Sequence, residues 1–392
     1  MRPYEKTHAW LKFSLDLRQA PASTWITLGE CQAKVSALTA ISIPPIVAKE
    51  LHQLYLAKAA LANIAIEGNT LAEQEVLDRL NQRATLPPSR EYLVRELDGM
   101  LGGFAWVRET LPAILAGKLT LDPAAIKALN RQVLSGLSPD SGVVPGEIRI
   151  VERQVGAYRA APAQDGEFLL ERLCDWLNRK AFTPPPGMTM VYGLIKAVVA
   201  HLYLAWIQPF ADGNGRTARL AEWAILLAAG VPEPAAHLLG IHYHLTRSEY
   251  YRRLDPAGRA AGEVEPFLAY AAQGFRDGLN ELGARLKKIQ AEALWRSHVD
   301  EIFRSKKGPA AERQRRLVLA LAEQPGPVAA ADLPGLSAYT ARVYARKTAK
   351  TLFRDVQGLL ALGLMEKTAA GLRARSEAVT AFRPIEAEEL WE

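Results

Sequence analysis

The chain has 392 residues, of which 49% are hydrophobic and 23% are charged, and this composition excludes a largely disordered protein. Lys and Arg number 48 and Asp and Glu number 42, which gives a formal net charge of +6. The two cysteines, Cys31 and Cys174, are too few for a disulfide framework or a zinc site. The first 30 residues contain no uninterrupted apolar run, so we expect a reduced, cytoplasmic protein with no membrane contact.

Most of the chain shows the three- and four-residue hydrophobic spacing of helices. The first expected helix covers about 46–67 and ends at Gly68-Asn69. Further helices are expected from Thr70 onward and at 90–112, 122–136, 165–180, 189–207, 217–229, 246–254 and 263–290. The longest apolar stretch, 190–210, contains Lys196, His201 and Gln208, so it is interpreted as an internal helix rather than a membrane span. A short extended segment or hairpin is predicted at 147–158.

The most informative stretch is a glycine-rich turn between two helices, Gln208-Pro209-Phe210-Ala211-Asp212-Gly213-Asn214-Gly215-Arg216-Thr217-Ala218-Arg219. Gly213 and Gly215 permit positive φ and let backbone N–H groups converge on an anion. The helix that follows points its positive N-terminal end at the same spot. Arg216 and Arg219 lie three residues apart, and Asp212 is an oxygen ligand suited to Mg²⁺. The residues predict a phosphate cradle beside a metal ligand; the alternative is a plain turn with solvated arginines.

This string resembles the signature of the Fic family, H-x-F-x-(D/E)-G-N-G-R-x-x-R. It matches at every fixed position except the first, where Gln208 stands in place of the family's His. Two further segments extend the resemblance over about 45–290. Residues 146–158 look like the flap, a hairpin that docks a target segment by strand pairing. Residues 62–69 look like the inhibitory helix motif (S/T)-x-x-x-E-(G/N), with Asn63 where the family has Ser or Thr.

The resemblance implies an all-α fold with a Fic-type helical core and a small β-hairpin flap. It also implies an activity, which is transfer of AMP from ATP, with Mg²⁺, to a hydroxyl of a target protein or of the chain itself. The domains would be an N-terminal helical region at 1–115 with its inhibitory helix at about 46–68, a Fic core at 116–290, and a helical linker with a winged-helix-like domain at 291–392.

Residue roles carry over only to matching positions. By resemblance, Asp212 would hold Mg²⁺ and Arg219 would bind the γ-phosphate of ATP. The remaining phosphate contacts would come from the residues between them, Gly213, Asn214, Gly215 and Arg216. Glu67 would pair with Arg219 and hold ATP in an unproductive pose, because an acid aimed at a phosphate-binding Arg competes for its donors.

The segment Ser248-Glu249-Tyr250-Tyr251 resembles the family's downstream stretch that lines the nucleotide base site. The resemblance therefore assigns Tyr250 and Tyr251 to ATP binding. His237, His242 and His244 lie upstream of it and provide no evident third metal ligand. They are interpreted as base-site lining or as part of a solvated loop.

Gln208 is the main departure, because in the family the His at this position takes the proton from the attacking hydroxyl. A Gln amide has no useful basicity at neutral pH, and loss of a general base costs a factor of about 10²–10⁴ in rate. Binding of ATP should survive, because Gln removes neither a phosphate contact nor the metal ligand. His201 would lie about 10.5 Å away along the helix axis. It is therefore interpreted as a helix-packing histidine rather than a replacement base.

The C-terminal segment is strongly basic, since 304–383 holds 15 Lys or Arg against 6 Asp or Glu, a net +9. Helices are expected at 310–323 and 329–333, a long helical pattern covers 338–362, and 363–375 suits a two-stranded wing. This order resembles a winged helix-turn-helix, a fold that lays a helix in the DNA major groove. Duplex DNA is one candidate partner, and a structural or homodimerising role is the alternative.

Two functions stay open at this point. One is a nucleotidyltransferase that Glu67 inhibits and that Gln208 weakens or alters. The other is a catalytically deficient, nucleotide-binding scaffold that regulates transcription or a partner through its C-terminal domain. Gln208 favours the scaffold, whereas the complete turn and the retained Glu67 favour the enzyme, because a dead site has little use for an inhibitor. A role as a toxin or antitoxin partner is a third interpretation.

Overall fold

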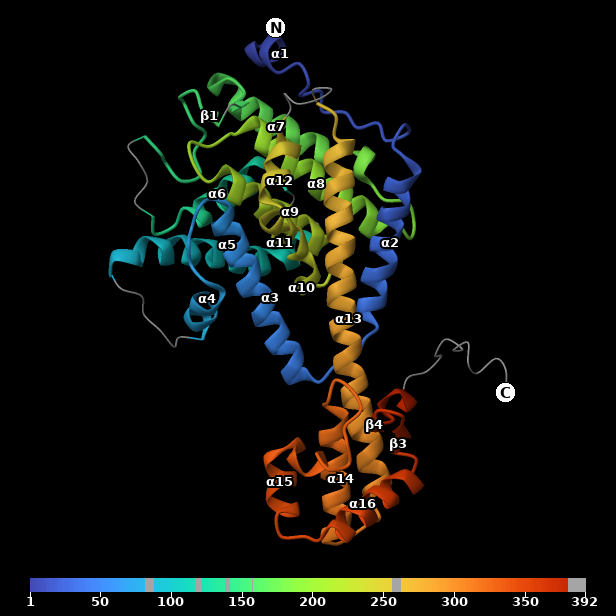
Figure 1. Ribbon diagram of the computed structural model, residues 1–392. Coiled ribbons are helices and arrows are strands. Elements are labelled where there is room, and N and C mark those ends of the chain that lie inside the picture. Colours follow the sequence, from blue (N-terminus) through green and yellow to red (C-terminus); the bar gives the residue numbers. More distant parts are fainter. Residues whose placement is uncertain (82–87, 117–120, 138–141, 157, 256–261, 380–392) are drawn as a thin grey trace. The chain divides into compact units, whose positions relative to one another are not determined.

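The computed structural model describes residues 1–392 except 82–87, 117–120, 138–141, 157, 256–261 and 380–392 (Figure 1). The chain forms two compact units. The first contains Met1–Ala40 and Pro45–Gly283, and the second contains Ile41–Pro44 and Ala284–Glu392. Most of the predicted N-terminal region therefore folds together with the predicted Fic core. Helix α13, Glu265–Phe303, has residues in both units.

The first unit is built almost entirely from helices, as the sequence predicts. They are α1 Pro3–Thr7, α2 Ala22–Thr39, α3 Pro45–Ile66, α4 Glu73–Leu80, η1 Pro88–Arg90, α5 Glu91–Leu115, α6 Pro123–Val133, η2 Ala163–Asp165, α7 Gly166–Leu177, η3 Lys180–Phe182, α8 Thr189–Ile207, α9 Asn214–Ala228, α10 Glu233–Ala236, α11 Leu238–Leu245, α12 Arg247–Leu254 and the start of α13. The strands β1, Gln154–Val155, and β2, Tyr158–Arg159, pair antiparallel with Gln154 opposite Arg159.

Helix α8 is the core helix of this unit. Among the described helices it alone is long and apolar enough to cross a membrane, but 83% of its most apolar window is buried inside the protein. Its contact with α9 is the most extensive between any two elements of the unit. Helices α3, α5 and α6 also contact α9. The turn between α8 and α9 is therefore anchored at both ends in the core.

Three expected boundaries differ from the structure. Helix α4 begins at Glu73 rather than at Thr70, and Glu75 accepts a hydrogen bond from the Ala72 N–H at 2.8 Å. Helix α9 begins at Asn214, three residues earlier than expected, so the glycine-rich string forms its first turn. The extended segment at 147–158 forms only a two-residue ladder, at β1 and β2.

The second unit contains the rest of α13 and a small helical domain with a hairpin. Its elements are α14 Pro309–Ala322, η4 Leu333–Leu336, α15 Ala338–Tyr344, α16 Ala349–Ala361, β3 Met365–Thr368, β4 Gly371–Ala374 and η5 Ser376–Val379. Strands β3 and β4 form the expected hairpin, and an isolated bridge joins Val328 to Leu372. Leu317, Leu333 and Leu359 are fully buried in its own core.

The single long helix expected at 338–362 is wrong, because the chain turns between α15 and α16. The turn lets Tyr344 on α15 donate to the buried Asp355 carboxylate on α16 at 2.9 Å. Arg313 on α14 donates to the same carboxylate. The short helix expected at 329–333 is replaced by the 3₁₀ turn η4. The structure has a helix–turn–helix followed by a hairpin, which is the order that the sequence predicts. The winged-helix assignment stays a prediction.

Candidate functional site

Gln208 ends α8 in a left-handed conformation, with φ 50° and ψ 58°. It is 8% exposed, and its backbone N–H donates to the Leu204 carbonyl at 3.0 Å. Its side-chain Nε2 donates to the Ala205 carbonyl at 2.9 Å. The amide that replaces the family's His is thus tied to its own helix, and it offers no basic atom to a hydroxyl.

Two asparagines hold the shape of the turn. The Asn214 side chain accepts from the Phe210 N–H at 2.9 Å and donates to the Phe210 carbonyl at 2.7 Å. Asn130, fully buried on α6, donates to the Asp212 carbonyl at 2.9 Å and accepts from the Gly146 N–H at 2.9 Å. Asn214 was predicted to contact phosphate, but here one donor and one acceptor of its amide shape the turn.

Arg149 fixes the flap segment to the turn. It is 3% exposed, its Nε donates to the Gln208 carbonyl at 2.6 Å, and its Nη1 donates to the Val151 carbonyl at 2.8 Å. A further bond reaches the Ala161 carbonyl, and its backbone N–H donates to the Pro209 carbonyl at 3.0 Å. Burial lowers the pKa of Arg149. Its position at the C-terminal end of α8 favours a cation, because free carbonyls and the helix dipole are negative there.

The start of the predicted flap pairs with the turn rather than with a second long strand. An isolated antiparallel bridge joins Ile148 to Phe210. Arg153 donates to the Ala211 carbonyl, and its Nη2 lies 3.7 Å from Asp212 Oδ1. Residue 157, which the predicted flap included, lies outside the described residues. The flap segment and the α8–α9 turn are therefore joined by backbone and side-chain contacts of residues 148–153.

Asp212, the predicted Mg²⁺ ligand, lies on the turn with 44% of its side chain exposed. Its Oδ2 is 3.4 Å from Arg216 Nη2. Mg²⁺ in phosphate sites is usually held by one or two carboxylates plus phosphate oxygens and waters. A single accessible carboxylate beside a phosphate cradle fits that requirement. The described residues contain no group of three or more His, Cys, Asp or Glu side chains that could hold a metal on its own.

Arg216 is a buried cation that is only partly paired, since its Nη2 contacts Asp212. It is 5% exposed, and its Nε and Nη1 have no hydrogen-bond acceptor among the described residues. It lies in the first turn of α9, whose N-terminus has no side-chain cap. Leaving buried donors unpaired is costly, more so for a charged group. Two donors of Arg216 are therefore free for a further acceptor.

Arg219, by contrast, is 3% exposed and well satisfied. Its Nη2 lies 2.7 Å from Glu67 Oε1, which is the expected ion pair. Asn63 accepts from Arg219 Nε through its side chain at 2.8 Å and from Nη2 through its carbonyl at 3.0 Å. Arg219 Nη1 donates to Tyr250 Oη at 3.3 Å. The Asn that departs from the inhibitory motif thus holds the same arginine as Glu67.

The Glu67 carboxylate occupies space beside the first turn of α9. A Cβ on Gly215 would lie 2.5 Å from Glu67 Oε1, so a side chain at that position would force the Glu67 carboxylate to move. About a third of the Glu67 side chain is exposed. Burial would raise the pKa of Glu67, but the charge and hydrogen bond of Arg219 outweigh it and hold the pKa below its usual range. An internal carboxylate therefore lies where a helix N-terminus favours an anion.

The two tyrosines assigned to the base site differ in exposure. Tyr250 is 1% exposed and stacks on Tyr243 at 4.8 Å, so it supports Arg219 from the core and presents no ring surface. Tyr251 is 40% exposed, and its hydroxyl donates to the Ile66 carbonyl at 3.1 Å. The Arg247 guanidinium lies 5.6 Å from the Tyr251 ring centroid. Only Tyr251 of the pair is accessible to a ligand.

His201 and His237 are buried and pack against aromatic rings. His201 is fully buried, and its Nε2 lies 2.9 Å from Tyr250 Oη. His237 stacks on Trp223 at 4.9 Å, and burial lowers the pKa of His237 to about 3. The expectation of a solvated loop for His242 and His244 is wrong, because both lie on helix α11.

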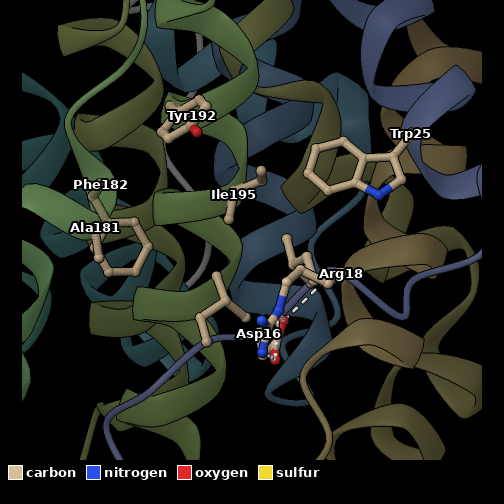
Figure 2. A pocket seen from close by; sticks show the side chains of 9 residues that line it. Asp16, Arg18, Trp25, Ala181, Phe182, Tyr192 and Ile195 are labelled. Atoms are coloured by element: carbon tan, nitrogen blue, oxygen red, sulfur yellow. Dashed lines mark hydrogen bonds and ion pairs between the residues drawn. The ribbon is translucent and has the colours of Figure 1, made fainter.

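A cavity of about 500 Å³ elsewhere in the unit contains none of the predicted site residues (Figure 2). It is lined by apolar and aromatic side chains, including Phe182 and Ile195, and by the Asp16–Arg18 ion pair. The Arg18 guanidinium lowers the pKa of Asp16 to about 2. This cavity is therefore not the candidate site. The candidate site is the α8–α9 turn, where buried cations and a carboxylate lie together.

Residues 120–226, which include this turn, match the sequence profile of the Fic/DOC family. The chain carries a Fic/DOC domain. It is 32% identical over 215 residues to the protein adenylyltransferase fic-1 of Caenorhabditis briggsae, and 29% identical over 245 residues to the protein adenylyltransferase Fic of Drosophila willistoni. These matches cover 54% and 62% of this chain. The chain spans only 38% and 45% of the length of these curated relatives.

Solved structures show the same fold. Fic-1 from C. elegans, residues 134–508, superposes with a TM-score of 0.55 at 22% identity, over 68% of this chain and 73% of that one. A Fic family protein from Desulfovibrio desulfuricans G20 superposes with a TM-score of 0.54 at 18% identity, over 95% of this chain and all of that one. The helical fold predicted from the sequence is confirmed.

The sequence alone missed four contributors to the site. Asn130 and Arg149 brace the turn from 82 and 59 residues away, so no local pattern reveals them. Arg153 contacts the turn from the flap, and Arg247 lies beside Tyr251. The one available signal was the presence of polar residues, such as Asn130, on the apolar face of a predicted helix.

Proposed function

We propose that the Fic domain binds Mg-ATP at the α8–α9 turn and transfers AMP to a hydroxyl of a target protein or of the chain itself. The observation that carries the proposal is Arg216, a 5% exposed guanidinium with two unpartnered donors at an uncapped helix N-terminus. A polyphosphate supplies the acceptors that these donors lack. The curated relatives, which are protein adenylyltransferases, support the same reaction.

Different residues of the turn would bind different parts of the nucleotide. Asp212 would hold Mg²⁺, which when bound neutralises phosphate charge. Backbone N–H groups at Gly213 and Gly215, with Arg216, would bind the α- and β-phosphates. Arg219 would meet the γ-phosphate once the Glu67 carboxylate has moved away from it, because both anions need the same guanidinium.

The flap segment offers a surface for the target. Ile150 is 91% exposed, Val151 is 61% exposed and Val155 is 40% exposed. Arg149 and the Ile148–Phe210 bridge fix this segment beside the turn. An extended target segment that pairs with these residues would bring its hydroxyl to the bound nucleotide.

In the proposed step, the hydroxyl oxygen forms a bond to the α-phosphorus and the bond from that phosphorus to the β-phosphate oxygen breaks. Pyrophosphate leaves, and the hydroxyl proton passes to water. Gln208 cannot take this proton, because its amide is not basic and already donates to the Ala205 carbonyl. Gln208 should therefore make the chain a slow adenylyltransferase by lowering the rate of transfer without lowering the affinity for ATP.

Incubation with radiolabelled ATP and a bacterial lysate, followed by mass spectrometry, tests the function. Glu67→Gly is expected to label itself or a lysate protein with AMP, and the added mass identifies the transferred group. Glu67→Gly combined with Arg216→Ala is the matched control and should label neither. If both proteins stay unlabelled while Glu67→Gly binds ATP, the chain acts as a nucleotide-binding scaffold.

We propose DNA binding as a second function, carried by the distribution of charge in the second unit. No Asp or Glu lies between 333 and 354. Five exposed cations lie in this stretch without an ion-pair partner among the described residues, and we call them the basic face: Arg342, Arg346, Lys347, Lys350 and Arg354. The acids of the unit pair elsewhere, for example Glu312 with Arg316 and Asp355 with Arg313.

Lys350 and Arg354 lie one turn apart on α16, the second helix of the helix–turn–helix. A helix that presents exposed, unpaired cations near its N-terminal end fits the major groove of duplex DNA. Phosphate contacts from such a face are expected to make the affinity strongly dependent on salt. This would couple the nucleotide site to gene regulation, as the scaffold hypothesis requires.

A further inference from the structure

A line of buried polar side chains runs from Arg219 into the core of the first unit. Arg219 Nη1 lies 3.3 Å from Tyr250 Oη, and Tyr250 Oη lies 2.9 Å from His201 Nε2. His201 Nδ1 lies 3.1 Å from Glu222 Oε2 but has no hydrogen-bond partner among the described residues, so the line of hydrogen bonds ends at His201. Arg219, Tyr250 and His201 are at most 3% exposed. We call these three residues the buried relay.

The chemistry of the groups gives the relay a direction. Arg219 can only donate, so the Tyr250 oxygen accepts and its O–H is free to donate to His201 Nε2. The Tyr250 hydroxyl is therefore held between a donor, Arg219, and an acceptor, His201.

The partners of Arg219 come from two elements. Asn63 and Glu67, both on or directly after α3, provide three of its contacts, and Tyr250 on α12 provides the fourth. A nucleotide that displaces Glu67 from Arg219 weakens the hold of the α3 side. Tyr250 then provides one of three remaining contacts, the other two coming from Asn63, and it is the one from α12. Without it the buried guanidinium would lose a partner and a contact that fixes its orientation.

We propose that Tyr250, held by His201, positions Arg219 for the terminal phosphate of the nucleotide. This inference rests on the proposed binding of ATP. His201 and Tyr250 are positioning residues, because neither touches the nucleotide. The relay therefore sets the preference for a triphosphate over a monophosphate, since only the triphosphate presents a group to Arg219.

Core packing alone would explain the burial of these rings, so the test needs a matched pair. Tyr250 and Tyr243 are both fully buried or nearly so, and they stack on each other at 4.8 Å. Each hydroxyl has a buried partner, but only that of Tyr250 contacts Arg219; that of Tyr243 donates to Glu222 Oε1 at 2.8 Å. Tyr250→Phe and Tyr243→Phe each keep the ring and remove one hydroxyl.

The experiment is calorimetric titration of Mg-ATP and of AMP into Glu67→Gly and into the same protein with each substitution. Tyr250→Phe is expected to weaken ATP binding about tenfold and to leave AMP binding unchanged, because one hydrogen bond to a charged group is lost. Tyr243→Phe should change the ATP-to-AMP ratio by no more than about twofold. His201→Phe should act like Tyr250→Phe although it is remote from the phosphates, and His201→Gln, which restores an acceptor for Tyr250, should recover part of the preference.

An equal ATP-to-AMP ratio in Tyr250→Phe and Tyr243→Phe would overturn the relay. If Glu67→Gly itself binds no ATP, the proposed function fails instead, and crystal structures of the same variants decide the relay. The relay then predicts that the Arg219 guanidinium moves in Tyr250→Phe and keeps its position in Tyr243→Phe. An unmoved guanidinium in both would overturn it.

Discussion

The Fic domain and the second unit both gather positive charge, but they hold it in opposite ways. Arg216 and Arg219 are buried at a helix N-terminus, and an internal carboxylate already occupies one of them. Lys350 and Arg354 are exposed and have no ion-pair partner among the described residues. A buried guanidinium requires an anion at a defined position, whereas exposed cations attract any dense line of phosphates. The buried arginines should therefore discriminate between ligands by their number of phosphates. Binding to the exposed cations should instead depend mainly on salt concentration.

The largest expected effect is on DNA binding by the basic face. If the full chain contacts about four phosphates of a duplex, its affinity should fall about a hundredfold between 50 and 200 mM salt, because the log–log slope is about −0.9 per contact. Fluorescence anisotropy with a labelled duplex measures this. Lys350→Ala should reduce the slope by about one contact, whereas Arg316→Ala, already paired with Glu312, should not. No binding at low salt would remove this half of the comparison.

The next effect concerns the missing base. Gln208→His combined with Glu67→Gly should raise AMP transfer at least about tenfold over Glu67→Gly alone, because a general base contributes a factor of about 10²–10⁴. ATP affinity should change little, since the side chain contacts only its own helix. Gln208→Ala in the same background is the control, because it removes the amide without adding a base. A fast Glu67→Gly single variant would show that another group or water already takes the proton.

Within the Fic domain, the two buried arginines should separate by nucleotide. Arg219→Ala in the Glu67→Gly background should weaken ATP binding about tenfold and leave AMP binding almost unchanged, because only ATP has a γ-phosphate. Arg216→Ala should weaken binding of both nucleotides, because the proposal assigns Arg216 to the phosphates nearer the base. Titration calorimetry compares them. Equal losses for both nucleotides in Arg219→Ala would mean that Arg219 contacts a different part of the ligand.

The smallest expected effect is that of pH on the block by Glu67. Because Arg219 holds the pKa of Glu67 below its usual range, the ion pair is fully formed above the ordinary pKa of a Glu and is lost only as pH falls through the lowered value. The affinity ratio between Glu67→Gly and the unaltered chain should therefore be constant from pH 5 to pH 8. A change of about tenfold over this range would mean that a group other than Glu67 controls the block.

Much of this site could be predicted because its strongest signals are local. The apolar run of α8, the two glycines and the arginines on the next helix all lie within one stretch, and α8 has the expected bounds. The pairing of Glu67 with Arg219 spans 152 residues, and only the family resemblance indicated it. Asn63 was recognised as a departure from the motif, but its two contacts to Arg219 depend on how α3 packs against α9.

The features that were not predicted arise from packing between distant segments. The sequence resemblance assigned Tyr250 to the nucleotide base site, yet the aromatic cluster with Tyr243 and Phe267 buries its side chain. The turn between α15 and α16 depends on the buried Asp355, which accepts from residues on two other helices. Hydrophobic spacing within one helix cannot reveal either arrangement, because both depend on residues in other helices.

The central claim is that the Glu67 carboxylate occupies a site built for a nucleotide phosphate. Calorimetric titration of Mg-ATP into the unaltered chain, Glu67→Gly and the near-isosteric Glu67→Gln tests it most directly. We expect both variants to bind ATP about tenfold more tightly than the unaltered chain, while AMP binds all three alike, because only ATP competes for Arg219. Equal ATP affinity in all three proteins, with the nucleotide bound in the same pose, would contradict the account.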